Sequence, residues 1–259
     1  MSNYVLEDAR ENERLERQAK LSSYALTAEL RGVALNAKDR ILDAGCGTGL
    51  LGRHLRETYG TQAYIGLDVS AERLKEARLA SPGLRFDVAD LFDRASLARF
   101  RGQVDVLFNR YVMHHVRDHH VILENFYDVL PEGGRLCIVD IDGIFVNVGT
   151  PRSELARDIQ RVADGFGGDL TVGRRLPALL AQAGFRDIRW EIQTMDFQGE
   201  ERADEVQQFA ERLEFARPTI TRVLGSELAY KRFVKDYLTE LASPTTAVFY
   251  NKFIIQAVK

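Results

Sequence analysis

The sequence is poor in cysteine, proline and long apolar runs. Its 259 residues contain only 2 cysteines and 6 prolines. Two cysteines cannot form the disulfide framework that stabilises small secreted domains. Cys46 lies in a glycine-rich loop and Cys137 lies inside an expected strand, so we expect both to be reduced thiols in a cytoplasmic protein.

The sequence also lacks an excess of positive charge. It has 35 Lys and Arg against 38 Asp and Glu, a formal net charge of -3. Nucleic-acid binding generally needs a basic face, so we expect no nucleic-acid partner. No apolar run approaches the roughly 20 residues of a membrane span, and the charged N-terminus has no apolar signal-peptide core. We therefore expect no membrane association.

Short apolar runs alternate with amphipathic stretches along the chain. Such alternation is typical of βαβ units, which form a parallel sheet covered by helices on both faces. The stretches Leu50–Tyr59, Ala71–Ala80 and Val121–Leu130 have helical periodicity. The expected strands are Ile41–Ala44, Ala63–Asp68, Leu84–Val88, Val104–Phe108, Arg135–Ile141, Ile188–Met195 and Ala247–Val258.

The last expected strand runs to the C-terminus with no helix behind it. It therefore cannot begin another βαβ crossover, and we expect it to be inserted antiparallel to its neighbours. The predicted fold class is α/β: a Rossmann-like, seven-stranded, mostly parallel sheet with the last strand antiparallel, helices on both faces and helical additions.

A length of 259 residues favours one elaborated domain. Residues 143–175 and 200–243 are longer than the basic fold requires. The second addition reads as a two-helix insertion broken at Pro218, a candidate lid or dimer surface. The expected parts are an N-terminal helical cap (1–37), a cofactor-binding core (38–142), the second half of the sheet (143–199), the insertion (200–243) and the final strand (244–259).

The loop ILDAGCGTGLLG, residues 41–52, fits two cofactor patterns. From Gly47 it matches G-x-G-x-x-G, the fingerprint of nicotinamide-dinucleotide binding. In that fold the first glycine follows the strand directly, whereas here Ala44, Gly45 and Cys46 would intervene. From Asp43 it reads D-x-G-x-G-x-G, which places the acid at the strand end and Gly45 at the turn. The second register fits the strand better.

Acids follow the next two strands as well. Asp68 ends the second strand, where either cofactor would offer ribose hydroxyls. Asp90 and Leu91 follow the third strand. The three features together resemble a class I S-adenosylmethionine (SAM)-dependent methyltransferase of the small-molecule, natural-product type, over roughly residues 38–142.

The resemblance implies SAM as cofactor, with S-adenosylhomocysteine as product. Asp43 and the glycines would hold the methionine part, Asp68 the ribose, and Asp90 and Leu91 the adenine. Segments after the fourth strand and in the N-terminal helix would lie near the cofactor, although a solvated helix face explains the N-terminal charges equally well. The implied cofactor residues are Asp43, Gly45, Cys46, Gly47, Gly49, Asp68, Val69, Asp90, Leu91, Asn109, Arg110, Arg17, Gln18 and Tyr24.

The segment NRYVMHHVRD after the fourth strand contains adjacent histidines. His114 and His115 resemble a pair in small-molecule O-methyltransferases in which one His deprotonates the acceptor; a purely structural role is the alternative. As neighbours they should point in different directions. Asp140 ends the fifth strand and could orient one of them, with Asp142 as its competitor. A metal site formed by these groups is weakly supported, and we predict none.

Signatures of base, cytosine-C5 and protein-arginine methylation are absent from the sequence. The expected function is methyl transfer from SAM to an oxygen, nitrogen or carbon of a small organic acceptor, such as a bulky secondary metabolite. The apolar acceptor would be lined by aromatic residues of the additions, which core packing explains as well: Phe145, Phe166, Phe215, Tyr230 and Tyr237. Reuse of the SAM fold for cyclisation or sensing is the alternative, and a homodimer is left open.

Overall fold

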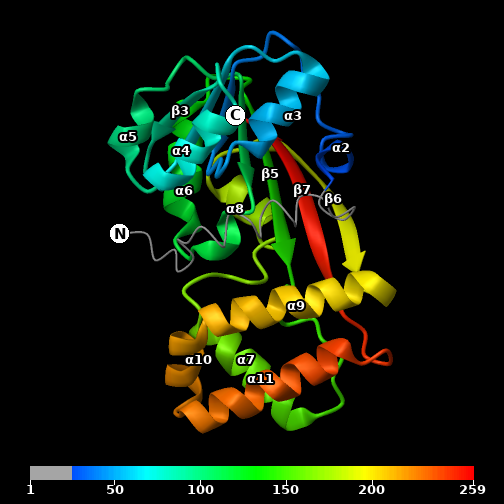
Figure 1. Cartoon of the computed structure of the whole chain (residues 1–259). Helices are drawn as coiled ribbons and strands as arrows, with labels where there is room; N and C mark the ends of the chain where they lie inside the picture. The colour runs from blue at the N-terminus through cyan, green and yellow to red at the C-terminus, as the bar shows by residue number, and fades with distance from the viewer. Residues whose placement is uncertain (1–24) are drawn as a thin grey trace.

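The computed structural model describes residues 25–259 and contains one seven-stranded sheet (Figure 1). The strand order is β3-β2-β1-β4-β5-β7-β6. The strands are β1 (Ile41–Ala44), β2 (Tyr64–Asp68), β3 (Arg85–Val88), β4 (Val106–Arg110), β5 (Arg135–Asp142), β6 (Arg186–Asp196) and β7 (Phe249–Val258). All seven expected strands are confirmed, with boundaries shifted by at most two residues.

The direction of the last strand is also confirmed. Strands β1 to β5 pair in parallel, while β7 pairs antiparallel with both β5 and β6. The strand β7 therefore alone runs against the others. Because the sheet order reverses between β1 and β4, the ligand-binding crevice of such a fold lies outside the carboxyl ends of these strands.

Helices cover both faces of the sheet. Alternate strand residues point to opposite faces: Leu136 and Ile138 belong to one buried cluster, and Cys137 and Val139 to the other. The first cluster includes residues of α5 (Arg94–Ala98), α6 (His119–Val129) and α8 (Leu176–Gln182). The second includes residues of α2 (Leu26–Glu29), α3 (Leu50–Tyr59) and α4 (Ala71–Ala80). Both faces of the central strands are thereby removed from water.

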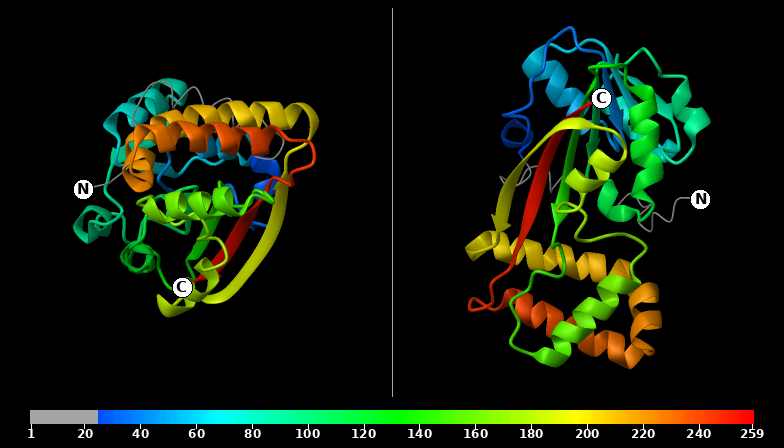
Figure 2. Two further views of the ribbon diagram at one scale, coloured as in Figure 1. Left: turned by 90° about the horizontal axis from the view of Figure 1, so that it is seen from below. Right: turned by 180° about the vertical axis from the view of Figure 1, so that it is seen from behind.

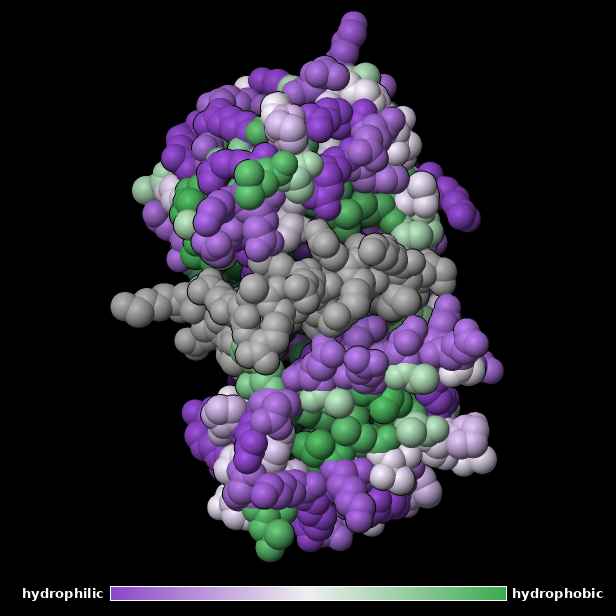
Figure 3. Space-filling model, in the orientation of Figure 1, coloured by the Kyte–Doolittle hydropathy of each residue, from purple (hydrophilic) through white to green (hydrophobic). Residues whose placement is uncertain are grey.

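Four helices form a cap at the carboxyl edge of the parallel strands (Figures 1 and 2). They are α7 (Ser153–Gly165), α9 (Gly199–Phe215), α10 (Arg217–Leu224) and α11 (Glu227–Ala242). They share a third hydrophobic cluster, and Figure 3 shows apolar residues between hydrophilic bands over this half of the molecule. The expected two-helix insertion is thus wrong in number, because α10 is a third helix. Pro218 is its second residue, in the first turn, where the missing N–H costs nothing.

The first described helix is short. A helical cap was expected over residues 1–37, and in the described part of that range only Leu26–Glu29 forms a helix before a turn. Leu26 and Leu30 are buried against the sheet, as the apolar pattern requires. Within residues 25–259, no helix is both long and apolar enough to cross a membrane.

Candidate functional site

The glycine-rich loop leaves β1 at the carboxyl edge of the sheet. Gly45, Gly47 and Gly49 all have positive φ values of 86°, 54° and 75°, which glycine adopts without steric cost. A Cβ at Gly45 would lie 2.4 Å from a methyl carbon of Val112, whereas a Cβ at Gly47 would meet nothing within 4 Å. The loop therefore packs tightly against the segment after β4 on one side and is open at Gly47.

Asp43 ends β1 beneath this loop. It is buried, and its carboxylate accepts a 2.6 Å hydrogen bond from the Tyr64 hydroxyl on β2. Burial raises the pKa of Asp43 to about 7, although the Tyr64 hydrogen bond and the charge of Arg110 oppose this rise. A cation placed beside Asp43 would favour its ionised form. Sequence reasoning missed Tyr64, whose position on β2 gave no signal.

The acids after β2 and β3 organise their own turns. Asp68 accepts hydrogen bonds from the backbone N–H groups of Gly47 and Ser70, both at 2.9 Å. Asp90 accepts one from the N–H of Phe92 at 3.0 Å. Each carboxylate has lone pairs left for further donors. Next to these acids Val69 is exposed and Leu91 is buried; both lie at the same edge.

Cys46 does not present its thiol to this edge. Its side chain is buried in the cluster beneath the sheet, and a Cβ at Gly66 would lie 2.8 Å from its sulfur. Burial raises the pKa of this thiol. Only the backbone of Cys46 can therefore belong to the binding loop.

Asn109 lies at the end of β4, beside β1. Its side-chain amide donates a 2.7 Å hydrogen bond to the Ala44 carbonyl, while its fully buried Oδ1 has no hydrogen-bond partner among the described residues. A buried orphan acceptor is costly, so this atom marks a place for an external donor. The neighbouring Arg110 binds Glu29 of α2 at 2.6 Å and lies over the Tyr111 ring.

His114 and Asp140 meet at the ends of β4 and β5. The His114 Nδ1 lies 2.7 Å from Asp140 Oδ1, and the other Asp140 oxygen accepts the N–H of Met113 at 2.7 Å. Asp140 is fully buried and also accepts the N–H of Ile141. The carboxylate is therefore rigidly held, and it fixes the orientation of the His114 ring.

The two histidines do not point apart as expected. The segment Met113–His115 forms a 3₁₀ turn, and the His114 and His115 ring centroids lie 3.8 Å apart at an interplanar angle of 42°. Consecutive side chains of a 3₁₀ turn are about 120° apart around the axis, whereas those of an extended chain point to opposite sides, so here the two rings can touch. The pair thus forms one unit.

Asp142 is occupied by another partner. Its carboxylate accepts hydrogen bonds from the side chain and the backbone N–H of Arg174, two residues before α8. It does not compete for the histidines. Within the described residues no group of three or more His, Cys, Asp or Glu side chains is arranged to hold a metal ion.

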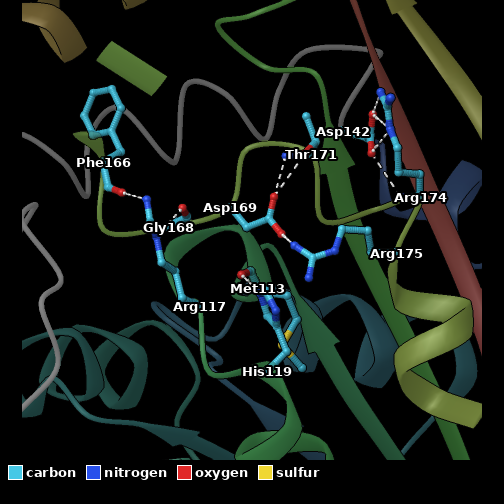
Figure 4. Close-up of polar contacts among 10 residues, drawn as sticks. All are labelled: Met113, Arg117, His119, Asp142, Phe166, Gly168, Asp169, Thr171, Arg174 and Arg175. Atoms are coloured by element: carbon cyan, nitrogen blue, oxygen red, sulfur yellow. Dashed lines mark hydrogen bonds and ion pairs between the residues drawn. The ribbon is translucent and has the colours of Figure 1, made fainter. Parts of the chain in front are cut away.

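A hollow of about 370 Å³ lies against the 3₁₀ turn, between α7 and the loop that follows it (Figure 4). Asp169 donates its backbone N–H to the His114 carbonyl at 2.9 Å, and a Cβ at Gly168 would lie 2.1 Å from that oxygen. Only glycine permits this approach. The lining is mostly polar: Arg117, His119, Val146, Gln160, Ala163, Asp164, Gly168, Asp169, Leu170, Thr171 and Arg175.

The aromatic residues proposed to line an apolar pocket serve mainly as core. Phe145 and Tyr237 stack with ring centroids 4.9 Å apart, and Tyr230 is buried in the same cluster. Phe166 is half-buried and Phe215 is exposed. Arg17, Gln18 and Tyr24 lie outside the described residues.

Comparison with known proteins identifies the family to which the chain belongs. A family model described as "Methyltransferase domain" matches residues 13–189, more than half of the chain. The phosphoethanolamine N-methyltransferase 1 of Triticum aestivum is 29% identical over 167 residues, 63% of this chain and 31% of that protein. The trans-aconitate 2-methyltransferase of Rhizobium etli is 36% identical over 129 residues, 50% of this chain and 47% of that protein. The match thus spans less than half of either relative.

A solved structure shares the fold. The phosphoethanolamine N-methyltransferase 2 of Haemonchus contortus, in complex with phosphomonomethylethanolamine and S-adenosylhomocysteine, superposes with a TM-score of 0.56 at 20% identity. The superposition covers 90% of this chain and 52% of that one.

Proposed function

The chain belongs to the SAM-dependent methyltransferases, and from this premise we propose that it transfers a methyl group from SAM to an oxygen, nitrogen or carbon of a small organic acceptor, leaving S-adenosylhomocysteine. The observation that carries the proposal is the juxtaposition at one sheet edge of the Asp43–Gly49 loop with the pair formed by His114 and the buried Asp140.

The residues at this edge fit SAM. The open side of Gly47 leaves room against the loop backbone, and the orphan Oδ1 of Asn109 offers an acceptor near the end of β1. Asp43 beneath them favours a cationic ammonium, and the remaining lone pairs of Asp68 suit a ribose diol. In this assignment Asp90 and Leu91 face the adenine. The remaining neighbours of the cofactor are Val69, Arg110 and the backbone of Cys46.

When bound, SAM supplies an electrophilic methyl carbon. The task of the protein is to align the acceptor with it and to exclude water. The cap lies over the carboxyl edge where these residues gather, so it is placed to close the site from solvent (Figure 1).

His114 is the proposed general base for a protonated acceptor. An ionised Asp140 can only accept hydrogen bonds, so the contact at Nδ1 places the proton of the imidazole there and leaves Nε2 to take a proton from the acceptor. Asp140 is then a positioning residue, which also stabilises the imidazolium that forms. His115, in ring contact with His114, supports its orientation.

The acceptor is proposed to be small and polar. The hollow, whose Asp169 binds the His114 backbone carbonyl, is lined by two arginines and two aspartates. The large aromatic side chains of the cap, by contrast, mostly pack against one another. The two relatives named above carry polar acceptors in their names, trans-aconitate and phosphoethanolamine. A small polar acceptor fits this lining and differs from the bulky, apolar acceptor expected from the sequence.

The decisive experiment separates binding from chemistry. Calorimetric titration with SAM and S-adenosylhomocysteine should show binding by the wild type and by His114→Ala. A mass-spectrometric screen of phenols, carboxylic acids and amines then identifies the acceptor. With it, His114→Ala should lower kcat by about 10²- to 10⁴-fold at unchanged SAM affinity.

The exposed His120, on α6, offers a matched control. His120→Ala should retain full kcat, and Asp140→Asn should lower kcat and shift its pH profile. Absence of SAM binding would overturn the proposal as a whole. SAM binding with no methylated product from any acceptor would instead favour cyclisation or sensing.

We also propose that the protein works in the cytoplasm. Cys46 and Cys137 are both free and buried, and burial raises the pKa of Cys137 to about 12. Buried protonated thiols are suited to a reducing compartment.

A further inference from the structure

The strand β6 lies at the end of the sheet, next to β7 only (Figure 2). It is eleven residues long, and no described strand pairs with its outer edge. Most of its side chains are exposed. Long edge strands invite pairing with another chain, and proteins usually protect them with proline, lysine or bulges. Residues 186–196 contain neither proline nor lysine, and the one irregularity lies at the start, between Arg186 and Arg189.

An apolar stripe follows one face of this edge. Trp190 and Ile192 are 57% and 50% exposed, although their cross-strand neighbours on β7, Ile255 and Phe253, are buried. Ile188, two residues before Trp190, is half-buried on the same face. The hydrophobic face of the sheet therefore continues past the core to an edge where water meets large apolar side chains.

The opposite face of the same segment is charged in a self-complementary way. Arg189 and Glu191 flank Trp190. If two β6 strands pair antiparallel about a two-fold axis at Trp190, Arg189 of each strand faces Glu191 of the other. The same register places Ile188 opposite Ile192 twice. Both kinds of cross-strand pair are stabilising.

Other registers are less favourable. An axis at Arg189 would place Asp187 opposite Glu191, a pair of like charges, and an axis at Ile192 would place Trp190 opposite Thr194 and Glu191 opposite Gln193. Trp190 is thus the centre at which charge and apolar matching coincide.

We propose that β6 pairs antiparallel with β6 of a second copy of this chain, centred on Trp190, to form a two-fold symmetric dimer with a continuous sheet. Such an isologous contact is self-limiting, because the same surface is used on both subunits. The helices α9 to α11, an expected dimer surface, pack their apolar faces into the cap of their own chain instead. The strand β1, which leads into the glycine-rich loop, is separated from β6 by β4, β5 and β7, so the contact leaves the loop accessible.

Sedimentation equilibrium of the full chain tests the proposal. The wild type should show twice the monomer mass. Glu191→Arg and Arg189→Glu should each weaken dimerisation by about tenfold or more, since each creates like-charge pairs twice. The double variant Arg189→Glu/Glu191→Arg should restore the wild-type affinity.

A control variant and two spectroscopic measurements separate loss of dimerisation from loss of folding. Glu72→Arg, an exposed charge reversal on α4, should leave the dimer intact, and far-ultraviolet circular dichroism should show that every variant is folded. Trp190 is the single tryptophan, so its emission should shift to the blue as the dimer forms. A wild type that stays monomeric at all soluble concentrations, or single variants that dimerise like the wild type, would overturn the proposal. A double variant as weak as the singles would overturn the register.

Discussion

At the scale of single residues, β1 and the loop after it combine an acid whose pKa is raised with two glycines that differ in the space around them. Asp43 is buried with one hydroxyl partner, and its raised pKa means that folding favours its protonated form. Gly45 and Gly47 share a left-handed backbone, but only Gly45 is pressed against a neighbour. The two features yield separate predictions.

Asp43→Asn should change the pH dependence of stability. The carboxyl pKa rises from 3.8 to about 7 on folding, so the folded state binds more protons and the free energy of unfolding falls as pH rises between these values. Asn has no charge to bury, so the free protein should gain up to about 4 kcal/mol relative to wild type by pH 8. Urea unfolding between pH 5 and 8 measures this, and parallel profiles for the two proteins would contradict it. The affinity for SAM should fall.

Gly45→Ala and Gly47→Ala should differ in stability. Both place Ala in the left-handed region, at a cost of about 1–2 kcal/mol. Gly45→Ala also forces its Cβ onto Val112, which should add about 1–3 kcal/mol. Thermal unfolding compares them, and Val112→Ala should recover part of the loss only in the Gly45→Ala background. Gly47→Ala, whose methyl would fill the open side of the loop, should weaken SAM binding; equal stability losses at the two sites would refute the assigned contacts.

At the scale of secondary-structure elements, one arginine joins the cap to the turn that carries the histidines. Arg117, just after the 3₁₀ turn, donates hydrogen bonds to the carbonyl oxygens of Asp164, Phe166 and Gly168 at 2.8, 2.6 and 3.3 Å. Figure 4 shows Arg117 with Phe166 and Gly168. Those carbonyls lie at and beyond the C-terminal end of α7, where a cation is stabilising. Arg117 therefore sets the position of α7 relative to His114.

Arg117→Ala should loosen this connection. Acceptor KM should rise and stability should fall by about 1–2 kcal/mol, while SAM affinity stays constant. Arg117→Lys should recover only part of the lost stability and acceptor affinity, because a single ammonium cannot reproduce the planar donor fork of a guanidinium. Steady-state kinetics and calorimetry measure these effects. Arg157 is an exposed arginine on α7, and Arg157→Ala, the control, should match the wild type. A loss of SAM affinity in Arg117→Ala equal to its loss for the acceptor would contradict the assignment.

At the scale of the whole molecule, one buried carboxylate connects three distant parts of the chain. Glu29 of α2 binds Arg110 of β4 at 2.6 Å, the Tyr111 hydroxyl at 2.8 Å and Lys252 of β7 at 3.1 Å. Burial alone would raise the pKa of Glu29, but the charge and hydrogen bonds of Arg110, with those of Lys252 and Tyr111, hold it below its ordinary value. The charged form thus stabilises the fold at neutral pH.

Glu29→Gln should be more damaging than Lys252→Met. Removing the carboxylate takes a shared counter-charge from two buried cations and should cost about 3–5 kcal/mol, whereas Lys252→Met leaves Glu29 with Arg110 and Tyr111 and should cost less. Because the Glu29 pKa is lowered on folding, its stabilisation is lost as pH falls, and Glu29→Gln should converge with wild type in acid. Denaturant titrations at neutral and acidic pH measure this, and equal costs for both variants would contradict it.

Much of the architecture followed from local pattern. The limits of β1, α3 and α4 were predicted to the residue, because a strand or helix with a buried face records its own period. The reversed β7 followed from the absence of a helix after it. The helical cap expected over residues 1–37, by contrast, is an overestimate in its described part, where only Leu26–Glu29 is helical, since hydrophobic spacing does not report where a chain turns.

The sequence by itself determined the sheet, the direction of its last strand and the loop with its flanking acids, because these depend on neighbours within a few residues. Only the tertiary structure decided that Asp140 binds His114 while Asp142 binds Arg174. It alone also decided that Gly168 packs against the His114 carbonyl and that Glu29 pairs with Lys252. These partners are separated by 26, 32, 54 and 223 residues along the chain, far beyond the two- to four-residue spacing of a strand or helix period. Which distant residues come into contact depends on how the helices and strands pack in the folded chain, and the local spacing of residue types does not determine these contacts.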